Sequence, residues 1–408
     1  MNNTIAWKVN TMIQNGKTGT STRFLSCEEI TKAKQFHQSF PVYQPTPLRS
    51  LACLAKKLGV AGVYVKDESY RFGLNAFKVL GGSYAIARYL AQRLGADISE
   101  LPYHTLISPQ VKKQLGDITF ATTTDGNHGR GVAWTTRQLQ QKAIVYMPKG
   151  SSIQRLENIQ AEGAEACITE FNYDDAVRMT DEQAKQHGWI VVQDTVWEGY
   201  VEIPTWIMQG YGTMAAEAVE QLQALGIERP SHVLLQAGVG SLAGAVQGYL
   251  QEVYQDNSPA VAIVEADQAA CLYKSALAGD GEPRTVGGHM DTIMAGLACG
   301  EPNRIAWEVL RDYSRIFFSC PDWVAARGMR ILGNPLGSDS RIISGESGAV
   351  TMGLLSLLLA GGRWQEAKAA MGITADSTIL LFNTEGDTDP GKYQSIVWDG
   401  EYPSYNHL

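Results

Sequence analysis

The chain has 408 residues, of which 44% are hydrophobic and 19% are charged, so it is long enough for one or two α/β domains with a sizeable core. Its formal net charge is -8 at pH 7 and no basic stripe appears, which argues against nucleic acid as a partner. The sequence starts without the apolar segment of a signal peptide, and no apolar run is long enough to span a bilayer. We therefore expect a cytoplasmic protein.

The six cysteines and seven histidines are scattered along the chain. They form no C-x-x-C pair and show no ligand spacing, which argues against a structural zinc site and against a catalytic transition metal. This cysteine usage favours a reducing compartment, although the spacing alone does not decide whether a single disulfide forms.

The predicted elements begin after a polar segment. The first forty residues predict irregular structure, ending at the two prolines of Pro45-Thr46-Pro47, which favour an extended turn. From there, short apolar runs that predict strands alternate with stretches of helical periodicity. The predicted strands cover 62–68, 118–123, 143–148, 166–169, 189–193, 232–236, 261–265, 316–318 and 378–382. The predicted helices cover 51–58, 83–90, 129–140, 153–162, 174–186, 204–225 and 242–254, and others begin at Asp322, Gly348 and Trp364.

The strand runs are apolar throughout rather than alternating, which is typical of parallel strands covered on both faces. Strands that alternate with helices imply right-handed crossovers between parallel strands. The sequence therefore predicts an α/β fold with twisted, parallel-type sheets covered by helices. Residues 96–117 show no clear pattern, and the glycine-rich stretch 287–300 predicts a loop.

The most distinctive stretch runs from Tyr70 to Gly82. A loop rich in Gly and Asn is followed by Phe77 and Lys78, and an apolar helix comes directly after them. Apolar neighbours favour the neutral amine of a lysine, which is its nucleophilic form. The alternative is an ordinary surface lysine on the first turn of a helix.

A second motif, residues 122–129, stands where a strand ends and a helix begins. Backbone N–H groups at the start of a helix bind carboxylates well, so this loop is a candidate substrate site. The alternative is a helix cap supplied by Asp125 or Asn127.

A third motif, residues 236–244, joins a strand to a helix through a glycine-containing loop. Glycines let the backbone approach a phosphate, and the helix dipole adds attraction. A Rossmann fingerprint is the alternative, but its third glycine would fall at Ala243, and the motif lies past mid-chain.

Two further motifs carry polar side chains at the ends of predicted strands, where the sites of α/β proteins gather. Asp194 and, six residues later, Tyr200 follow one strand, and Thr384 follows the last strand. Asp194 is alternatively the cap of a turn. Glu346, in a Ser-Gly-Glu-Ser-Gly segment, is alternatively an acidic residue that stabilises the start of a helix.

The segment Asn75-Ala76-Phe77-Lys78 with the following Leu80-Gly81-Gly82 resembles the N-A-F-K-x-L-G-G of the diaminopropionate ammonia-lyases, a family of fold-type II pyridoxal-phosphate (PLP) enzymes. The other four motifs are similar to those of the same enzymes, in the same order and over nearly the whole chain. The resemblance implies two α/β domains with the cofactor in the cleft between them. It places residues 1–86 and 190–408 in the large PLP-binding domain and 87–189 in a smaller α/β domain.

The resemblance also implies cofactor contacts. Lys78 binds PLP covalently, Asn127 contacts its phenolic oxygen, and Thr384 lies against its pyridine nitrogen. The remaining expected cofactor-binding residues are Phe77, Gly238, Val239, Gly240, Ser241, Leu242 and Glu346.

The expected catalytic residues are Lys78, Asp125 and Asp194. The carboxylates suit a substrate with a second ammonium group, and Asp125 stands where the dehydratases of this superfamily usually have a small neutral residue. The expected substrate-binding residues are Thr123, Thr124, Asp125, Gly126, His128, Asp194 and Tyr200.

By this resemblance the chain converts D- and L-2,3-diaminopropionate to pyruvate and two ammonia in an α,β-elimination, as a homodimer. A serine/threonine dehydratase and a cysteine-synthase-like β-replacement enzyme are alternatives, against which Asp125 and Asp194 argue. A third alternative, from another class, is a nucleotide-binding regulatory or scaffold protein that uses only the glycine loop.

Overall fold

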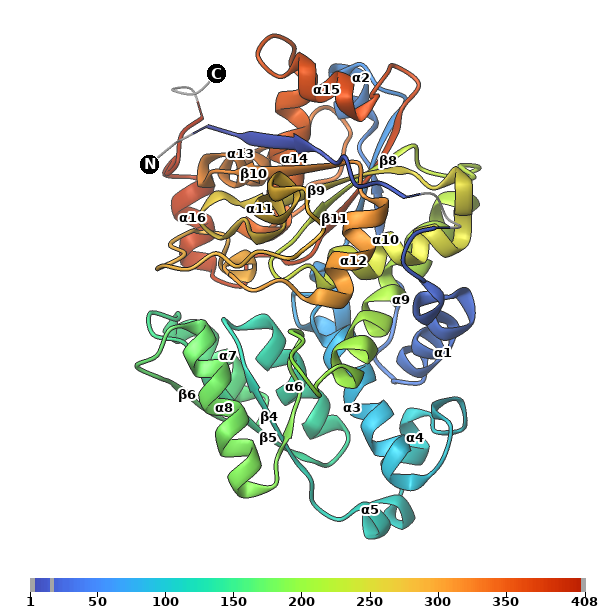
Figure 1. Ribbon diagram of the computed structural model, residues 1–408, viewed down its shortest axis with the longest axis vertical. Helices are drawn as coiled ribbons and strands as arrows, with labels where there is room; N and C mark the ends of the chain where they lie inside the picture. The colour runs from blue at the N-terminus through green and yellow to red at the C-terminus, as the bar shows by residue number, and fades with distance from the viewer. Residues whose placement is uncertain (1–3, 15–17, 405–408) are drawn as a thin grey trace. The chain divides into compact units, whose positions relative to one another are not determined.

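The structure, a computed structural model, describes residues 4–14 and 18–404 and divides into two compact units (Figure 1). The large unit comprises the described parts of Met1–Arg23, Thr46–Tyr70 and Met214–Leu408. The small unit comprises Phe24–Pro45 and Arg71–Thr213. The sequence-based division at residues 87 and 189 stays a prediction, and the compact units divide the chain at other positions.

A seven-stranded sheet forms the centre of the large unit, in the order β1-β10-β9-β8-β11-β3-β2. The five central strands are parallel, whereas β1 and β2 pair antiparallel at the two edges. The strands are β1 (Ala6–Val9), β2 (Leu48–Ser50), β3 (Gly62–Asp67), β8 (His232–Gln236), β9 (Ala260–Ala266), β10 (Ile316–Cys320) and β11 (Thr378–Asn383). Every residue of β8 and β10 is buried, as expected for strands covered on both faces.

The helices of the large unit surround this sheet. They are α2 (Ala52–Leu58), α10 (Ser241–Tyr254), α11 (Cys271–Ala278), α12 (Arg304–Tyr313), α13 (Asp322–Gly333), α14 (Glu346–Leu359), α15 (Gln365–Met371) and α16 (Pro390–Val397). Glycine lets α13 and α14 approach closely. A Cβ at Gly328 would lie 1.9 Å from the Ala349 carbonyl oxygen, so any side chain there would clash with α14. Helix α9 (Glu202–Ala224) contributes residues to both units.

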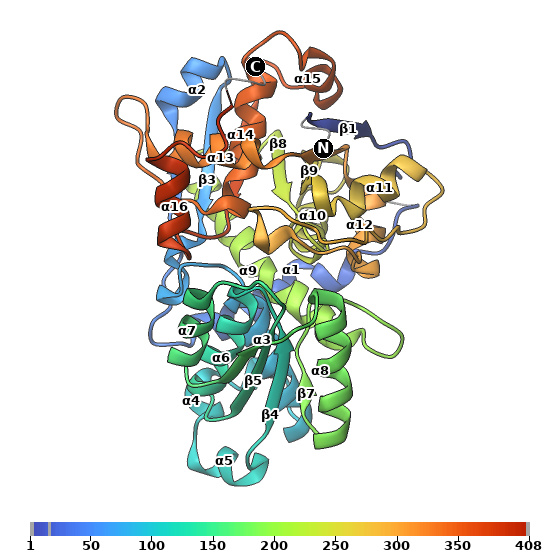
Figure 2. The same cartoon turned by 90° about the vertical axis from the view of Figure 1, so that its left-hand side faces the viewer.

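The small unit contains a four-stranded parallel sheet in the order β6-β5-β4-β7, most of which is labelled in Figure 2. Its strands are β4 (Thr119–Thr123), β5 (Lys142–Met147), β6 (Glu165–Ile168) and β7 (Ile190–Val191). Its helices are α1 (Cys27–Gln38), α3 (Val79–Leu94), α4 (Tyr103–Leu106), α5 (Pro109–Leu115), α6 (Asn127–Gln138), α7 (Ile153–Ala161) and α8 (Tyr173–His187). Among the residues that the structure describes, the 3-10 helices are η1 (Arg23–Leu25), η2 (Glu68–Gly73), η3 (Ile98–Glu100), η4 (Gln255–Asn257), η5 (Asp267–Ala269) and η6 (Ala295–Leu297).

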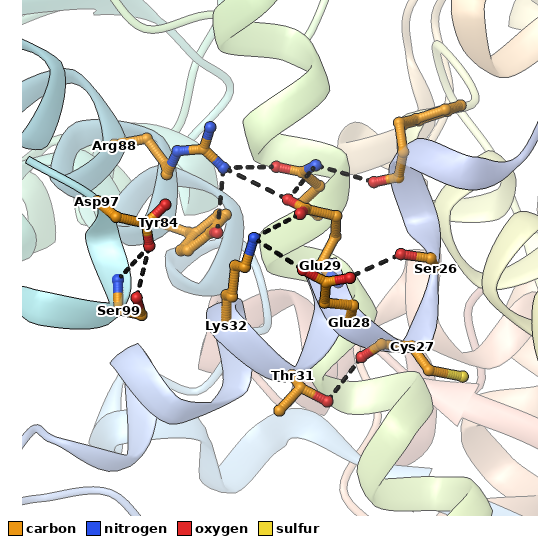
Figure 3. Close-up of polar contacts among 12 residues, drawn as sticks. Ser26, Cys27, Glu28, Glu29, Thr31, Lys32, Tyr84, Arg88, Asp97 and Ser99 are labelled. Atoms are coloured by element: carbon orange, nitrogen blue, oxygen red, sulfur yellow. Dashed lines mark hydrogen bonds and ion pairs between the residues drawn. The ribbon is translucent and has the colours of Figure 1, made fainter.

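A polar cluster joins α1 to α3 in the small unit (Figure 3). Glu29 of α1 forms ion pairs with Lys32, at 2.8 Å, and with Arg88 of α3, at 3.7 Å. Arg88 also donates a hydrogen bond to the Tyr84 hydroxyl at 3.3 Å. Tyr84 itself is buried, so the cluster fixes the helix that follows Lys78 against its neighbour.

A buried ion pair holds the extended turn at Pro45-Thr46-Pro47. In the large unit, Lys66 of β3 donates to Glu217 at 2.6 Å and to the Thr46 carbonyl oxygen at 2.7 Å. Lys66 and Glu217 are both fully buried, so each charge depends on the other for compensation.

The predicted fold class is confirmed, because both sheets are parallel at their centres and covered by helices. The expectation of an irregular first forty residues is wrong, since β1 and α1 lie there. Helix α1 escapes notice because its sequence, CEEITKAKQFHQ, is polar on average and buries only Ile30, Ala33, Phe36 and His37. Among the described residues, no helix is both long and apolar enough to cross a membrane.

Candidate active site

Lys78 lies directly before α3 and reaches a carboxylate of another segment. Its Nζ donates to Asp194 Oδ2 at 2.5 Å, and the two side chains are 18% and 4% exposed. Burial works to raise the pKa of Asp194, but the positive charge of Lys78 and its hydrogen bond outweigh it, so this pKa lies below its ordinary value. Asp194 is therefore ionised at neutral pH beside the amine.

Aromatic rings surround the amine of Lys78. Its Nζ lies 5.7 Å from the ring centroid of Phe77 and 5.9 Å from that of Tyr211, within the range of cation–π contacts. Tyr211 comes from α9 and is fully buried, and burial raises the pKa of its phenol. The sequence pattern indicated the apolar setting of Lys78 through Phe77 but not through Tyr211.

His128, on the first turn of α6, is buried next to these charges. Its Nε2 bonds the Val192 carbonyl oxygen at 2.8 Å, so Nε2 carries the proton. Its Nδ1 is buried and has no hydrogen-bond partner among the described residues. Burial lowers the pKa of His128, which keeps the imidazole neutral at pH 7.

The loop between β4 and α6 is held by Thr124. Its hydroxyl accepts hydrogen bonds from the backbone N–H groups of Gly126, at 2.9 Å, and of Gly129, at 3.0 Å. Asn127 opens the helix that follows. Since β4 and β7 are parallel neighbours, this loop and Asp194 follow the carboxyl ends of adjacent strands.

Asp125, in the same loop, forms an ion pair that the sequence did not reveal. Arg155 of α7 donates to Asp125 Oδ2 from Nη1 at 3.2 Å. The arginine side chain is 9% exposed and the aspartate side chain 24% exposed. The two residues stand thirty positions apart, and no motif linked them.

Two predicted substrate-binding hydroxyls are used within the fold. Thr123 donates to the Ala176 carbonyl oxygen at 3.1 Å. The Tyr200 hydroxyl accepts from the Gln193 backbone N–H at 2.7 Å and donates to the Val191 carbonyl oxygen at 3.0 Å. Their roles in substrate binding stay predictions that these contacts do not support.

In the large unit, the glycine loop connects β8 to the start of α10. Gly240 has a φ of 99°, which favours glycine, and a Cβ at Gly238 would lie 3.2 Å from Leu297 Cα. Helix α10 has 14 residues, and its first N–H groups have no acceptor within the helix. The glycines thus let the loop pack closely on its neighbours, and the N–H groups at the start of α10 are donors that fit a phosphate group.

Thr384 follows β11, the parallel neighbour of β8, at the same carboxyl edge of the large sheet. Its hydroxyl accepts a hydrogen bond from Gln236 Nε2 at 2.8 Å. Gln236, the residue directly before the glycine loop, was not predicted as a site residue. Glu346 opens α14 and is 5% exposed, and the neighbouring Ser347 N–H donates to Glu385 Oε1 at 3.1 Å.

The structure thus brings together Lys78, Asp194 and His128 in the small unit, and the glycine loop and Thr384 in the large unit. The roles assigned to these residues stay predictions, and so does the expected position of the cofactor between the domains. Sequence reasoning missed Arg155, Tyr211 and Gln236.

Comparisons with known proteins agree with the motifs. A family model described as pyridoxal-phosphate dependent enzyme matches residues 40–374. The diaminopropionate ammonia-lyase of Escherichia coli (strain K12) is 53% identical over 385 residues, covering 94% of this chain and 95% of that protein. The diaminopropionate ammonia-lyase of Salmonella typhimurium is 50% identical over 401 residues, covering 98% and 99%. The crystal structure of the Escherichia coli diaminopropionate ammonia lyase in complex with D-serine has 50% identity and a TM-score of 0.91, covering 98% of each chain.

Because that family model spans most of its length, the chain belongs to the pyridoxal-phosphate dependent enzymes, and its cofactor is pyridoxal phosphate. Within that class it falls among the diaminopropionate ammonia-lyases, to which it is similar over nearly its whole length. The resemblance seen in the five motifs is confirmed.

Proposed function

We propose that this protein eliminates the β-amino group of 2,3-diaminopropionate and yields, with one water, pyruvate and two ammonia. The observation that carries the proposal is the short contact between Lys78 and the buried Asp194. It pairs an amine that can hold PLP with a carboxylate that can hold an ammonium group. The relatives that share this chain's length are named for the same substrate.

The residues present fit the cofactor. Lys78 supplies the amine for its aldehyde, and the amides of residues 238–242 supply donors for its phosphate. When PLP is bound, Asn127 and Thr384 would supply polar side chains for the oxygen and nitrogen of its ring, and we assign Phe77 and Glu346 to its binding as well. When bound, PLP withdraws electron density from the substrate Cα and so eases loss of the Cα proton.

We assign the proton transfers to two residues. Lys78 takes the Cα proton of one enantiomer, because it serves only the face of the substrate on which it stands. Asp125 takes the Cα proton of the other enantiomer, the D isomer, from the opposite face. Asp194 binds the β-ammonium group and keeps it protonated as it leaves, which makes ammonia the better leaving group.

The charge of the site favours a diamine over serine or threonine. A buried, ionised Asp194 needs a cationic partner once Lys78 is engaged elsewhere, and the β-ammonium group of diaminopropionate supplies one. A hydroxyl group carries no such charge. The surroundings of Asp194 therefore oppose the dehydratase and β-replacement alternatives.

We further propose that the enzyme works in the cytoplasm as a homodimer and serves amino-acid catabolism. The scattered cysteines, which form no C-x-x-C pair, support this setting. The substrate is a small amino acid, and neither nucleic acid nor a membrane is needed for the reaction.

The experiment is a stoichiometry measurement on the purified, PLP-loaded chain. Diaminopropionate should give two ammonia per pyruvate, whereas serine, as the control, should give little product. Preferential turnover of serine, with one ammonia per pyruvate, would establish the dehydratase instead. A colourless protein that stays unmodified by borohydride after PLP addition would point to the regulatory alternative.

A further inference from the structure

The ion pair between Arg155 and Asp125 lies entirely within the small unit. Arg155 stands on the first turn of α7, and its Nη1 lies 3.2 Å from Asp125 Oδ2. The contact uses one oxygen of the carboxylate and leaves Oδ1 outside it. An arginine buried to this degree needs a partner for its charge, and Asp125 supplies one.

The stem of Arg155 also packs on the backbone next to Asp125. A Cβ at Gly126 would lie 2.9 Å from Arg155 Cδ and 3.3 Å from Arg155 Cγ. Gly126 has a φ of 153°, a conformation that favours glycine. The loop therefore matches the shape of the arginine as well as its charge, so the stem and the head of Arg155 are both placed against this loop.

We propose that Arg155 is a positioning residue that holds Asp125 in the orientation needed to remove the Cα proton of one enantiomer, and so sets the turnover of that enantiomer. This inference rests on the role proposed above for Asp125. It assigns to Arg155 no contact with substrate or cofactor.

Physical chemistry gives the expected size of the effect. A guanidinium is planar and directs its donors rigidly, so it restricts the carboxylate more than a lysine ammonium does. A charge-assisted hydrogen bond of this kind corresponds to a change of about tenfold or more in rate when its orientation matters for the reaction. Proton removal by Lys78 does not pass through Asp125 and should be unaffected.

No other arginine in this region takes the place of Arg155. Arg130 and Arg137 of α6 both pair with Glu162, which lies at the end of α7. His128 interacts electrostatically with Asp125, and burial keeps its imidazole neutral. Arg137 therefore offers a control, an arginine–carboxylate pair between α6 and the end of α7 that does not involve Asp125.

The experiment measures kcat and KM for D- and L-diaminopropionate with the full, PLP-loaded chain and five variants: Arg155→Met, Arg155→Lys, Asp125→Asn, the double variant Asp125→Asn/Arg155→Met, and the control Arg137→Met. We expect Arg155→Met to lower kcat for the D isomer about tenfold with little change for the L isomer. Arg155→Lys should restore part of the loss. In the Asp125→Asn background, Arg155→Met should have no further effect, because the two residues act together.

The outcomes separate the two proposals. If Asp125→Asn lowers kcat equally for both isomers, the role of Asp125 as a base fails. The alternative outcome is that Asp125→Asn lowers kcat for the D isomer alone. In that case the positioning role of Arg155 fails if Arg155→Met lowers kcat equally for both isomers, raises KM for both, or changes kcat for neither. The melting temperature of each variant accompanies the kinetics. If Arg155→Met does not fold, Arg155→Lys decides, since unchanged D-isomer turnover there overturns the proposal.

Discussion

At the scale of single residues, Lys78 combines features that few lysines share. Its amine contacts a buried carboxylate and lies over two aromatic rings. The Lys78→Ala variant should abolish turnover, because it removes the attachment point of the cofactor. Lys112→Ala, at a half-buried lysine paired with the exposed Asp117 in the same unit, should leave turnover unchanged.

The attachment point can also be read directly. After borohydride reduction of the PLP-loaded chain, mass spectrometry of its peptides should place the pyridoxyl group on Lys78. A pyridoxyl group on any other lysine would overturn the assignment of the whole site.

The two aspartates should differ in their effects on the two enantiomers. Asp125→Asn should reduce turnover of the D isomer far more than that of the L isomer, because only one face of the substrate depends on this base. Asp194→Asn should impair both, since the β-ammonium group is common to them and Asp194 lies against Lys78. Enantiomer-resolved kinetics decide between these roles, and equal losses in Asp125→Asn would leave it as a binding residue.

At the scale of the element, the glycine loop and α10 act together as an anion site. A Cβ at Gly240 would lie 3.3 Å from Leu272 Cδ1 and 3.4 Å from Leu310 Cδ1, at a φ of 99°, so Gly240→Asp should displace the loop and add a carboxylate to it. A carboxylate about 4 Å from the phosphate would repel it by about 4 kcal/mol at an effective dielectric constant of 20. PLP affinity should fall steeply. The measurement is the PLP content after dialysis, from absorbance, with circular dichroism for the fold.

The matched control for this loop is Gly279→Asp. Gly279 ends α11 with a φ of 69°, so it imposes a similar backbone strain, but it is exposed and open space surrounds it. This variant should retain PLP. If Gly240→Asp retained PLP equally well, the loop would have another function.

At the scale of the whole molecule, most of the fold was predictable because the central strands are continuous apolar runs. Strands β8 and β10 are buried along their full length, so hydrophobicity alone revealed them. Edge strands β1 and β2 were missed, because AWKV and LRS mix polar and apolar residues and are only partly buried. Helices α11 and α16, of eight residues each, were missed as well, and so was α12, although Ala306, Trp307, Val309 and Leu310 form a buried face with helical spacing.

The residues of the candidate site also fall into two groups, those that local motifs predicted and those that only the tertiary fold brings together. Local motifs predicted Lys78, the Thr124 loop and the glycine loop, since the residues of each motif are continuous in the sequence. Arg155 and Tyr211 reach the site from helices distant in sequence, and only the tertiary fold brings them near Asp125 and Lys78. A single sequence carries no mark of such contacts.

A buried carboxyl group gives a test of global stability. Glu265 of β9 accepts hydrogen bonds from the backbone N–H groups of Leu272, at 2.8 Å, and Tyr273, at 2.5 Å, and so fixes the start of α11. Burial raises the pKa of Glu265 to about 8, from an ordinary value of 4.5. Between these two values the folded chain binds a proton at Glu265 that the unfolded chain lacks.

The sign of the pH dependence follows from this difference. A raised pKa in the folded state stabilises the fold fully below pH 4.5, and this contribution is lost as pH rises toward 8. Glu265→Gln keeps a carbonyl acceptor but cannot ionise. From pH 5 to pH 8 the melting temperature of the parent chain should therefore fall relative to that of Glu265→Gln. Glu308→Gln, at an exposed position of α12, should show no such trend. Melting curves at several pH values decide it: parallel pH profiles for the parent chain and Glu265→Gln would mean that Glu265 titrates alike in the folded and unfolded chains.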